Sequence, residues 1–227
     1  MGEIAKAPQW LFDIPKPRAL LVIAHSDDET IFAGGLILSS RDTQWTIVNC
    51  FDGGDQTRRH EFLCACEFLA QNSGNHIEPV FLDPLQHSDH SIDCLSLAKA
   101  LEPYAVGYDI VFTHNRQGEY GHQEHKLVHR CVIESINNPN TWFFISPGST
   151  NVNQDDLRSK RDDGNKEVNL IPEILELKKR TFSECHVSQA KIYGYDGVSG
   201  KLRNTDLKET LSWYFEDPGK EEYTFYQ

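Results

Sequence analysis

The chain has 227 residues, of which 39% are hydrophobic and 25% charged, a balance typical of a folded globular protein. Its formal net charge of −12 argues against a nucleic-acid-binding function, because phosphate contacts need a basic surface. No run of apolar residues is long enough to span a bilayer, and residues 1–17 lack the pattern of a secretory signal. We therefore expect no membrane span and a cytoplasmic location.

Strand-like and helical patterns alternate along the chain. Apolar runs predict strands at 18–24, 45–51, 77–82, 108–113 and 142–145. Helical spacing of apolar residues predicts helices at 30–40, 57–72, 92–101, 122–136 and 172–183. This order predicts an α/β fold of the Rossmann-like, doubly wound type, with a mostly parallel sheet and helices on both faces.

The domain organisation is expected to be simple. Residues 1–227 are predicted to form a single domain with a core at about 18–189 and a C-terminal extension at 190–227, whose end is strand-like. The polar segment 151–169 is predicted to be a long loop or lid.

The six cysteines show no paired CxxC spacing, and we expect them to be buried free thiols in a reducing compartment. They are Cys50, Cys64, Cys66, Cys94, Cys131 and Cys185.

The first motif, Ala24-His25-Ser26-Asp27-Asp28-Glu29, directly follows the first strand-like run. At a strand-to-helix turn, His25 and Asp28 can converge on one ion while Asp27 faces its open side. Unpaired carboxylates at the top of a buried sheet are costly, and a bound cation would offset that cost. An N-capping aspartate with solvated neighbours is the alternative explanation of this segment.

The second motif runs from Gly118 to His125, after the fourth strand-like run. His122 and His125 are three residues apart and share a helix face. His129 lies on that face too, and for it a structural role is preferred. Tyr120 can present a phenol to a developing oxyanion, and the glycines let the backbone approach a ligand. The HExxH zincin signature and the zinc deaminase signature are absent.

Two histidines and one carboxylate make a suitable three-ligand set for a catalytic zinc, whose fourth position stays open for water. Asp27 and His122 could then serve as proton acceptor and donor. The sequence therefore indicates a metal-dependent hydrolase.

The two motifs resemble those of the LmbE/PIG-L-like zinc N-deacetylases, which remove acetyl groups from N-acetylglucosamine-type sugars. The family's AHPDDE motif is matched by AHSDDE at 24–29, and its Gly-x-Tyr-Gly-His-x-x-His pattern by residues 118–125. Weaker matches follow the family order over residues 18–189: Arg58, Glu61, Ala65 and Leu69, then Lys179, His186, Ser188 and Gln189. Ser26 stands where the family usually has proline; a proline would fix φ at this turn, so serine either loosens it or adds a hydrogen bond.

The resemblance implies His25, Asp28 and His125 as zinc ligands and Asp27 as the general base. It also implies His122 as the second proton carrier. Tyr120 is then expected near the carbonyl oxygen, and Arg58 is expected to contact the substrate. Zn²⁺ is the expected cofactor, although nitrogen and oxygen ligands also accept Fe²⁺ or Co²⁺.

The predicted function is hydrolysis of the acetyl amide of a small-molecule N-acetyl sugar or glycoconjugate. Two alternatives remain open: a zinc amidase or esterase acting on a non-sugar acyl group, and a non-catalytic sugar- or metal-binding protein. The sequence does not identify the sugar, the pathway or an oligomeric state. A nucleotide-binding Rossmann module is disfavoured, because carboxylates stand where a glycine-rich phosphate loop would be.

Overall fold

The structure, a computed structural model, describes residues 15–82, 94–145, 165–195 and 220–225. Its strands are β1 (Arg18–Ile23), β2 (Gln44–Asn49), β3 (His76–Phe81), β4 (Ile110–Thr113), β5 (Thr141–Ile145), β6 (Asn165–Asn169) and β7 (Lys220–Phe225). Its α-helices are α1 (Asp28–Ser39), α2 (Gln56–Ser73), α3 (Cys94–Leu101), α4 (Gln123–Ser135), α6 (Pro172–Cys185) and α7 (Val187–Tyr193). Two short 3₁₀ turns are η2 (Asp52–Gly54) and η3 (Glu102–Tyr104).

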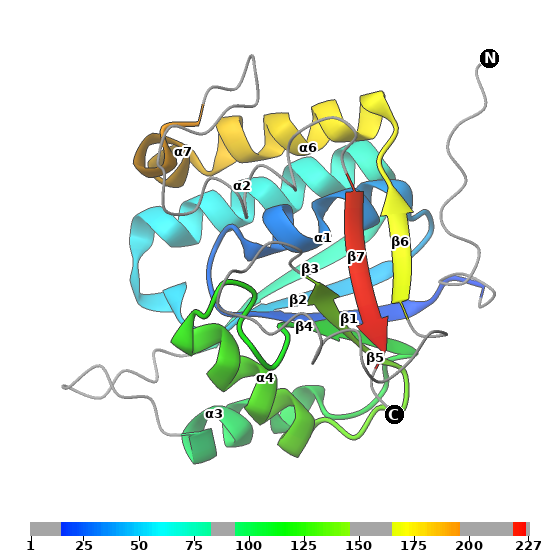
Figure 1. Cartoon of the computed structure of the whole chain (residues 1–227), viewed down its shortest axis with the longest axis vertical. Coiled ribbons are helices and arrows are strands. Elements are labelled where there is room, and N and C mark those ends of the chain that lie inside the picture. The colour runs from blue at the N-terminus through cyan, green and yellow to red at the C-terminus, as the bar shows by residue number, and fades with distance from the viewer. Residues whose placement is uncertain (1–14, 83–93, 146–164, 196–219, 226–227) are drawn as a thin grey trace.

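The strands form one sheet in the order β3-β2-β1-β4-β5-β7-β6. Strands β1 to β5 pair in parallel, which confirms the predicted doubly wound, mostly parallel architecture. The strand order reverses between β1 and β4, and the helices that follow these two strands lie on opposite faces of the sheet (Figure 1). Such a reversal leaves a crevice beyond the carboxyl ends of the strands, where α/β proteins of this type bind ligands.

Two apolar clusters cover the two faces of the sheet, because alternate residues of a strand point to opposite sides. Leu21 and Ile23 of β1 belong to the cluster that includes α1, α2 and α6. Leu20 and Val22 belong to the cluster that includes α3 and α4. All four side chains are fully buried, as the continuous apolar run of β1 predicts.

The far edge of the sheet differs from the prediction. Residues 165–169 fall in the segment predicted to be a loop, yet they form β6; residues 151–164 lie outside the described part of the chain. Strand β7, from the C-terminal extension, lies between β5 and β6 and is antiparallel to both. Backbone pairing with distant strands decides the conformation here, and a polar segment carries no local signal of that pairing.

The prediction of free thiols is wrong for four of the six cysteines. Cys64 of α2 forms a disulfide with Cys185 at the end of α6, and Cys94 of α3 forms one with Cys131 of α4. Their Cα–Cα distances of 5.4 and 6.0 Å are ordinary for disulfides. The partners are 121 and 37 residues apart in sequence, so only the packing of the helices brings them together. Cys50 and Cys66 are free and buried.

Among the described residues, no helix combines the length and the apolar character that crossing a membrane requires.

Candidate active site

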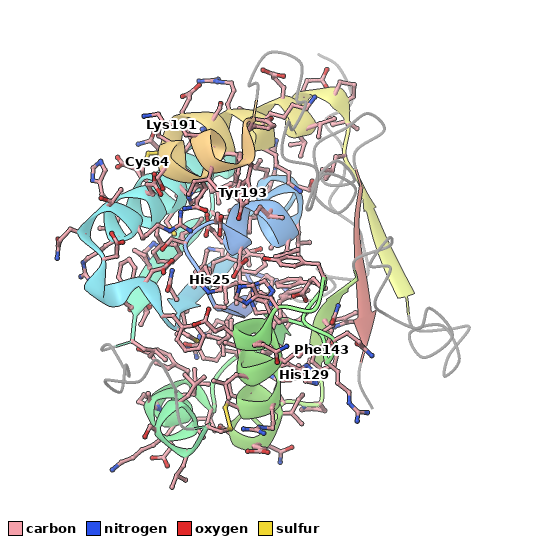
Figure 2. The ribbon with its side chains drawn as sticks, turned by 60° about the vertical axis from the view of Figure 1, so that its left-hand side comes forward. His25, Cys64, His129, Phe143, Lys191 and Tyr193 are labelled. Atoms are coloured by element: carbon pink, nitrogen blue, oxygen red, sulfur yellow. A yellow bond between two sulfur atoms is a disulfide. The ribbon has the colours of Figure 1, made fainter. Side chains whose placement is uncertain are left out.

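The two sequence motifs meet at the carboxyl ends of β1 and β4. β1 ends at Ile23 and α1 begins at Asp28, while β4 ends at Thr113 and α4 begins at Gln123. Because β1 and β4 are neighbouring parallel strands, the connections that follow them lie side by side. Figure 2 shows His25 in the middle of the molecule, between α1 and α4. Segments nearly 100 residues apart thus form one site.

Donor atoms of His25, Asp28 and His125 converge. Nδ1 of His25 lies 3.3 Å from Nε2 of His125. The Asp28 carboxylate lies 3.6 Å from the first nitrogen, through Oδ2, and 3.5 Å from the second, through Oδ1. Ligand atoms bound at about 2.0–2.2 Å to a tetrahedral zinc are themselves roughly 3.3–3.6 Å apart. The two histidine nitrogens and the Asp28 carboxylate are therefore close together, with one Asp28 oxygen near each histidine.

A carboxylate contacts the other ring nitrogen of each histidine. Oε2 of Glu124 lies 2.6 Å from Nε2 of His25, and Oε2 of Glu119 lies 2.6 Å from Nδ1 of His125. When these nitrogens donate their protons to the carboxylates, the lone pairs of the two remaining nitrogens face the same point beside Asp28. Lone pairs and a negative charge repel one another unless a cation lies between them. The donor set therefore fits a divalent ion with carboxylate-oriented histidine ligands.

The charges around the site also favour a positive charge at this point. Burial opposes protonation of His25, yet Asp28 and Glu124 outweigh it and raise the His25 pKa well above its usual value. Burial would raise the pKa of Asp28, but His125 and His114 outweigh it and hold that pKa well below the usual range. Asp28 is thus an anion in a nearly solvent-free setting, and such an anion needs a cationic partner.

Glu119 has no role predicted from the sequence, although it lies inside the second motif. Its side chain is fully buried, and its backbone has a φ of 54°, in the left-handed region that non-glycine residues rarely adopt. Besides His125 it contacts Nδ1 of His114 at 2.9 Å and accepts the Asn115 N–H at 2.8 Å. A strained, buried carboxylate with three partners is suited to fixing the orientation of His125.

Replacing Glu119 by glutamine is expected to weaken metal binding about 10–100-fold, because the amide keeps the shape but not the charge that makes His125 a strong donor. Metal affinity is to be measured by competition with a chelator. Gln117→Glu, which changes the charge in the opposite sense two residues away, serves as the comparison for effects of net charge. An unchanged affinity in Glu119→Gln would exclude this role.

His122 lies beside the same point and offers a second way to complete the donor set. His25, His122 and His125 have ring nitrogens within 4.8 Å of one another, as do the metal-capable atoms of Asp28, His114 and His125. Burial, reinforced by the nearby His125 and His25, lowers the pKa of His122 to about 4, so its ring is neutral at pH 7. Its buried Nδ1 has no hydrogen-bond partner in the described structure.

His114 belongs to the second of these groups but already uses both ring nitrogens. Its Nδ1 contacts Glu119, and its Nε2 lies 3.0 Å from the Ala24 N–H, which donates to it. Burial lowers the pKa of His114, but Glu119 and Asp28 outweigh it and raise the pKa to about 9. A protonated Nε2 could not accept the Ala24 N–H. The bond from the Ala24 N–H therefore needs an unprotonated Nε2, and a cation beside Asp28 would favour that form by cancelling the charge that raises the His114 pKa.

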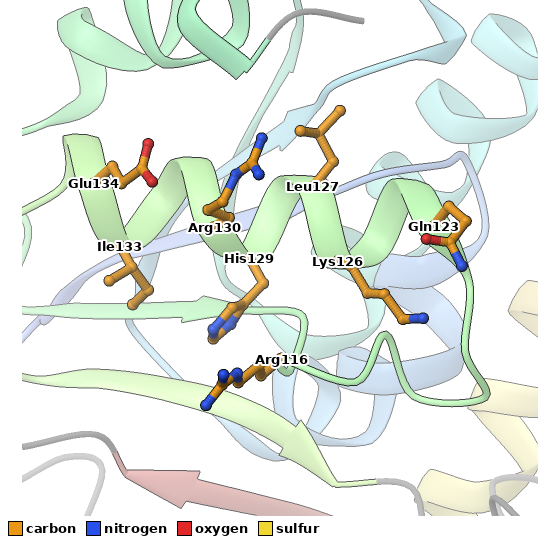
Figure 3. Close-up of a pocket in the computed structure, with 8 residues that line it drawn as sticks. All are labelled: Arg116, Gln123, Lys126, Leu127, His129, Arg130, Ile133 and Glu134. Atoms are coloured by element: carbon orange, nitrogen blue, oxygen red, sulfur yellow. The ribbon is translucent and has the colours of Figure 1, made fainter. Parts of the chain in front are cut away.

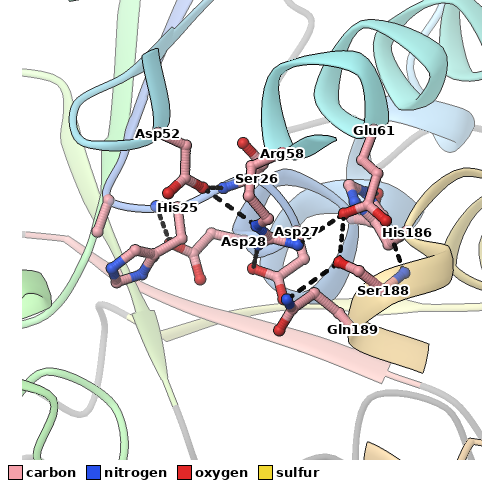
Figure 4. A network of polar contacts seen from close by, with 12 residues as sticks. His25, Ser26, Asp27, Asp28, Asp52, Arg58, Glu61, His186, Ser188 and Gln189 are labelled. Carbon is pink, nitrogen blue, oxygen red and sulfur yellow. Dashed lines mark hydrogen bonds and ion pairs between the residues drawn. The ribbon is translucent and has the colours of Figure 1, made fainter. Parts of the chain in front are cut away.

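Asp27 faces the site next to a charged network (Figure 4). Its side chain is buried, and Oδ1 lies 3.3 Å from Nη2 of Arg58. Burial raises the pKa of Asp27 to about 7, against the opposing effect of Arg58. Arg58 also pairs with Glu61 at 2.9 Å and with Asp52 at 3.5 Å. The described ion pairs of Arg58 are therefore all with protein carboxylates, although its side chain also lines the cavity described next.

A cavity of about 230 Å³ opens over these residues. Besides His25, Asp27, Asp28 and His122, its lining includes Tyr120 and Tyr193. Burial raises the pKa of both phenols, with further contributions from Asp28 and Asp27, so both hydroxyls keep their protons at neutral pH. Tyr120 thus lines the cavity with a protonated hydroxyl.

The segment around α7 completes the wall of the cavity. Glu61 accepts hydrogen bonds from the Ser188 N–H at 2.6 Å and the Ser188 hydroxyl at 2.8 Å, which ties α7 to α2. His186 lies 2.6 Å from Oε1 of Glu29, beneath the first motif. Sequence reasoning gave these residues no individual role, because their partners lie more than a hundred positions away.

Ser26, which replaces the usual proline of the resembled family, makes two hydrogen bonds. Its N–H donates to Oδ2 of Asp52 at 2.5 Å, and its hydroxyl accepts from Nδ2 of Asn49 at 2.8 Å. A proline has neither group. Serine therefore links the first motif to Asp52, and through Asp52 to Arg58.

Ser26→Pro is expected to lower the free energy of unfolding by about 1–3 kcal/mol, because Asn49 and Asp52 both lose a buried partner. Ser26→Ala removes only the hydroxyl, so it should cost less. Urea denaturation of both variants measures the difference. Equal stability of the two variants would contradict the importance of the Ser26 N–H.

The chain is similar to several known proteins. A model of the family described as PIG-L, GlcNAc-PI de-N-acetylase, matches residues 20–136. An uncharacterised protein of Acanthamoeba polyphaga mimivirus is 25% identical over 151 residues, which cover 60% of this chain and 64% of that protein, less than two thirds of its length.

Two solved deacetylases have a similar fold. The A40926 pseudoaglycone deacetylase Dbv21 superposes with a TM-score of 0.60 at 15% identity, over 92% of this chain and 96% of that one. A zinc-inhibited form of the teicoplanin deacetylase Orf2 superposes with a TM-score of 0.58 at 13% identity, over 92% and 97%. At such identities the likeness shows the fold.

Proposed function

Because the chain belongs to the PIG-L family of GlcNAc-PI de-N-acetylases, we propose that it is a metal-dependent enzyme that removes the acetyl group from an N-acetylated amino sugar. The observation that carries this proposal is the convergence of His25, Asp28 and His125 beside a buried Asp27. A protein that only stored metal would have no use for a carboxylate whose pKa is near 7 at the edge of the donor set.

His25, Asp28 and His125 are the residues that would hold the ion. A divalent ion held there supplies Lewis acidity toward water and toward the amide carbonyl. Zinc suits two imidazoles and one carboxylate, and iron or cobalt suits them as well. One deacetylase of this fold is known in a zinc-inhibited form, so the experiment described below compares the activity supported by each of these metals.

Asp27 is the proposed general base. As water attacks the acetyl carbon, Asp27 takes a proton from it, and a base with a pKa near the working pH does this efficiently. Arg58 holds the carboxylate through Oδ1 and favours its ionised form. A cation bound nearby would lower the pKa of Asp27 further and keep it ionised at neutral pH.

The carbon–nitrogen bond breaks only if the departing nitrogen receives a proton. His122 is neutral at pH 7, so the proton it delivers is one it gains during turnover, once negative charge has developed on the substrate. The water proton removed by Asp27 supplies it, and the products are the free amine and acetate. Tyr120 donates a hydrogen bond to the developing oxyanion, worth about 3 kcal/mol for one well-placed donor.

Incubation of the enzyme with a panel of N-acetyl sugars, followed by mass spectrometry, tests the proposal. The protein is first stripped by a chelator and then reloaded separately with Zn²⁺, Fe²⁺ or Co²⁺. Loss of one acetyl group from a sugar, only in a metal-loaded sample, is the expected result. Turnover of simple acyl amides or esters but of no sugar would favour a non-sugar amidase or esterase. Saturable binding of metal and sugar with no turnover would favour a binding protein.

A further inference from the structure

A cavity of about 470 Å³ lies beside α2 and the end of α6. No residue described as lining it also lines the catalytic cavity. Its lining includes both cysteines of the Cys64–Cys185 disulfide, of which Cys64 is half-buried and Cys185 is 4% exposed. The volume is typical of small-molecule sites, so a small molecule held there lies against the disulfide.

The carboxylates that line this cavity already have cationic partners. Glu61 pairs with Arg58 at 2.9 Å, and Glu184 pairs with Arg180 at 2.8 Å. Paired carboxylates repel an approaching anion less than free ones would. His60, which is exposed on α2, adds a ring that can form a hydrogen bond with a ligand. The cavity therefore admits a thiolate, the form of a thiol that attacks disulfides.

The second disulfide, Cys94–Cys131, has different surroundings. Neither cysteine lines the cavity described above, and Cys131 is fully buried. The sulfur of Cys94 lies 3.6 Å from Oε2 of Glu134, which belongs to the lining of another cavity, of about 560 Å³, along α4 (Figure 3). A carboxylate so close to the sulfur repels a thiolate. This disulfide therefore serves as an internal comparison for the first.

The Cys64–Cys185 disulfide also helps to hold α7 against α2. Cys185 is the last residue of α6, and α7 begins two residues later. Glu61, one turn before Cys64 on α2, accepts the N–H and the hydroxyl of Ser188 at 2.6 and 2.8 Å. Figure 2 shows Cys64 on α2 next to α7. None of the seven residues of α7 is buried, so the helix depends on the contacts at its start.

Helix α7 in turn forms part of the catalytic cavity. Gln189 and Tyr193 lie one turn apart on α7, and both line that cavity. A looser α7 would leave these two side chains less ordered. The disulfide is thus connected to the catalytic cavity through one short helix.

We propose that the Cys64–Cys185 disulfide is a thiol-exchange site, at which a small organic thiol opens the bond and loosens α7. The thiolate attacks Sγ of Cys64, the half-buried partner, and forms a mixed disulfide with it. The electron pair of the broken bond leaves with Sγ of Cys185, which then takes a proton from water. A second thiol molecule attacks the mixed disulfide and releases Cys64 as a thiol. Two thiols are thereby oxidised to one disulfide, and the protein gains two electrons and two protons.

Reduced glutathione is the probe that tests this site on the full-length, metal-loaded protein. Free thiols are alkylated after increasing times of incubation, and mass spectrometry of the peptides identifies the labelled cysteines. We expect labelling of Cys64 and Cys185 at least about tenfold faster than that of Cys94 and Cys131, with glutathione attached to Cys64 as the intermediate. Equal rates at the two disulfides would overturn the proposal. So would labelling of Cys64 and Cys185 before any thiol is added, or no opening by glutathione.

Amide hydrogen exchange follows the response of α7. After glutathione treatment, we expect the amides of residues 187–193 to exchange about threefold faster or more, while those of α1 keep their rates. Cys64→Ser/Cys185→Ser should show the same change, and the matched control Cys94→Ser/Cys131→Ser should not. Unchanged exchange in α7 after the bond has opened would contradict the coupling. Neither measurement requires turnover, so a failure here is distinct from a failure of the proposed deacetylase function.

A kinetic measurement relates the disulfide to catalysis, and this part rests on the proposed function. In Cys64→Ser/Cys185→Ser, the KM for the N-acetyl sugar is expected to rise about threefold or more, because two side chains of α7 must then be ordered when the sugar binds. Cys94→Ser/Cys131→Ser should keep the KM of the unaltered protein. An unchanged KM in the first variant, together with faster exchange in α7, would overturn the link between α7 and sugar binding.

Discussion

Replacement of Asp27 by asparagine is expected to lower kcat about a hundredfold or more while bound metal is retained. Asparagine keeps the size of the side chain and an Oδ1 that can still contact Arg58, which lies 3.3 Å away in the native protein. It cannot accept a proton from water, so the attacking oxygen loses its base. Acetate release measures kcat, and elemental analysis of the purified variant measures metal.

The matched control for this variant is Asp109→Asn, which makes the same change of charge. Asp109 accepts the Arg18 N–H at 2.8 Å beside the amino end of β4, at the opposite end of that strand from the site. An asparagine oxygen can accept the same bond, so kcat and stability should both stay unchanged. If Asp27→Asn instead loses its metal, and turnover per bound metal stays normal, then Asp27 is a ligand and the base lies elsewhere.

Replacement of His125 by alanine is expected to weaken metal binding more than about a hundredfold. This effect should exceed that of Glu119→Gln, because the ligand itself is lost and not only the carboxylate that orients it. It removes Nε2, which lies 3.3 Å from the His25 nitrogen and 3.5 Å from Asp28. It also removes one of the partners of the buried Glu119 carboxylate, so a lower melting temperature should accompany the loss. His60→Ala, an exposed position on α2, is the control.

His122→Ala distinguishes the two possible donor sets. If His25, Asp28 and His125 hold the metal, this variant keeps it and loses kcat, because the leaving nitrogen has lost its proton donor. The all-histidine group of His25, His122 and His125 leads to the opposite expectation: His122→Ala would lose the metal, and Asp28→Asn would keep it. Metal content of the two variants, measured together, decides between the sets.

The parts of the site that the sequence predicted are those whose geometry is local. His25 and Asp28 lie on one turn, and the N–H of His25 donates to Oδ2 of Asp28 at 2.8 Å. His122 and His125 lie on one helical turn, at the start of α4. The alternation of strands and helices then placed both motifs at carboxyl ends of strands, because parallel sheets need helical crossovers. The apolar runs of β1 and β4, buried on both faces, made those strands recognisable.

The carboxylates that orient the donor set were not predictable in the same way. Glu124 reaches His25 across 99 positions in sequence, and the Asp52 carboxylate reaches the Ser26 N–H across 26. Acidic side chains are usually solvated, so nothing in their local pattern marks these two as buried or half-buried partners. Their roles appear only when η2 and α4 come to lie beside the turn that follows β1.

The sequence by itself determined the fold class and the family, and it singled out the candidate residues for binding metal and carrying protons, because spacing along a strand or a helix turn is a local property. Only the tertiary structure decided which carboxylates support the histidines, how β7 enters the sheet, and which cysteines pair. Each of these depends on contacts between segments far apart in the chain, such as the 121 residues between Cys64 and Cys185. Such contacts form because burial of two apolar faces brings distant helices together, and no local sequence pattern specifies which helices will pack against each other.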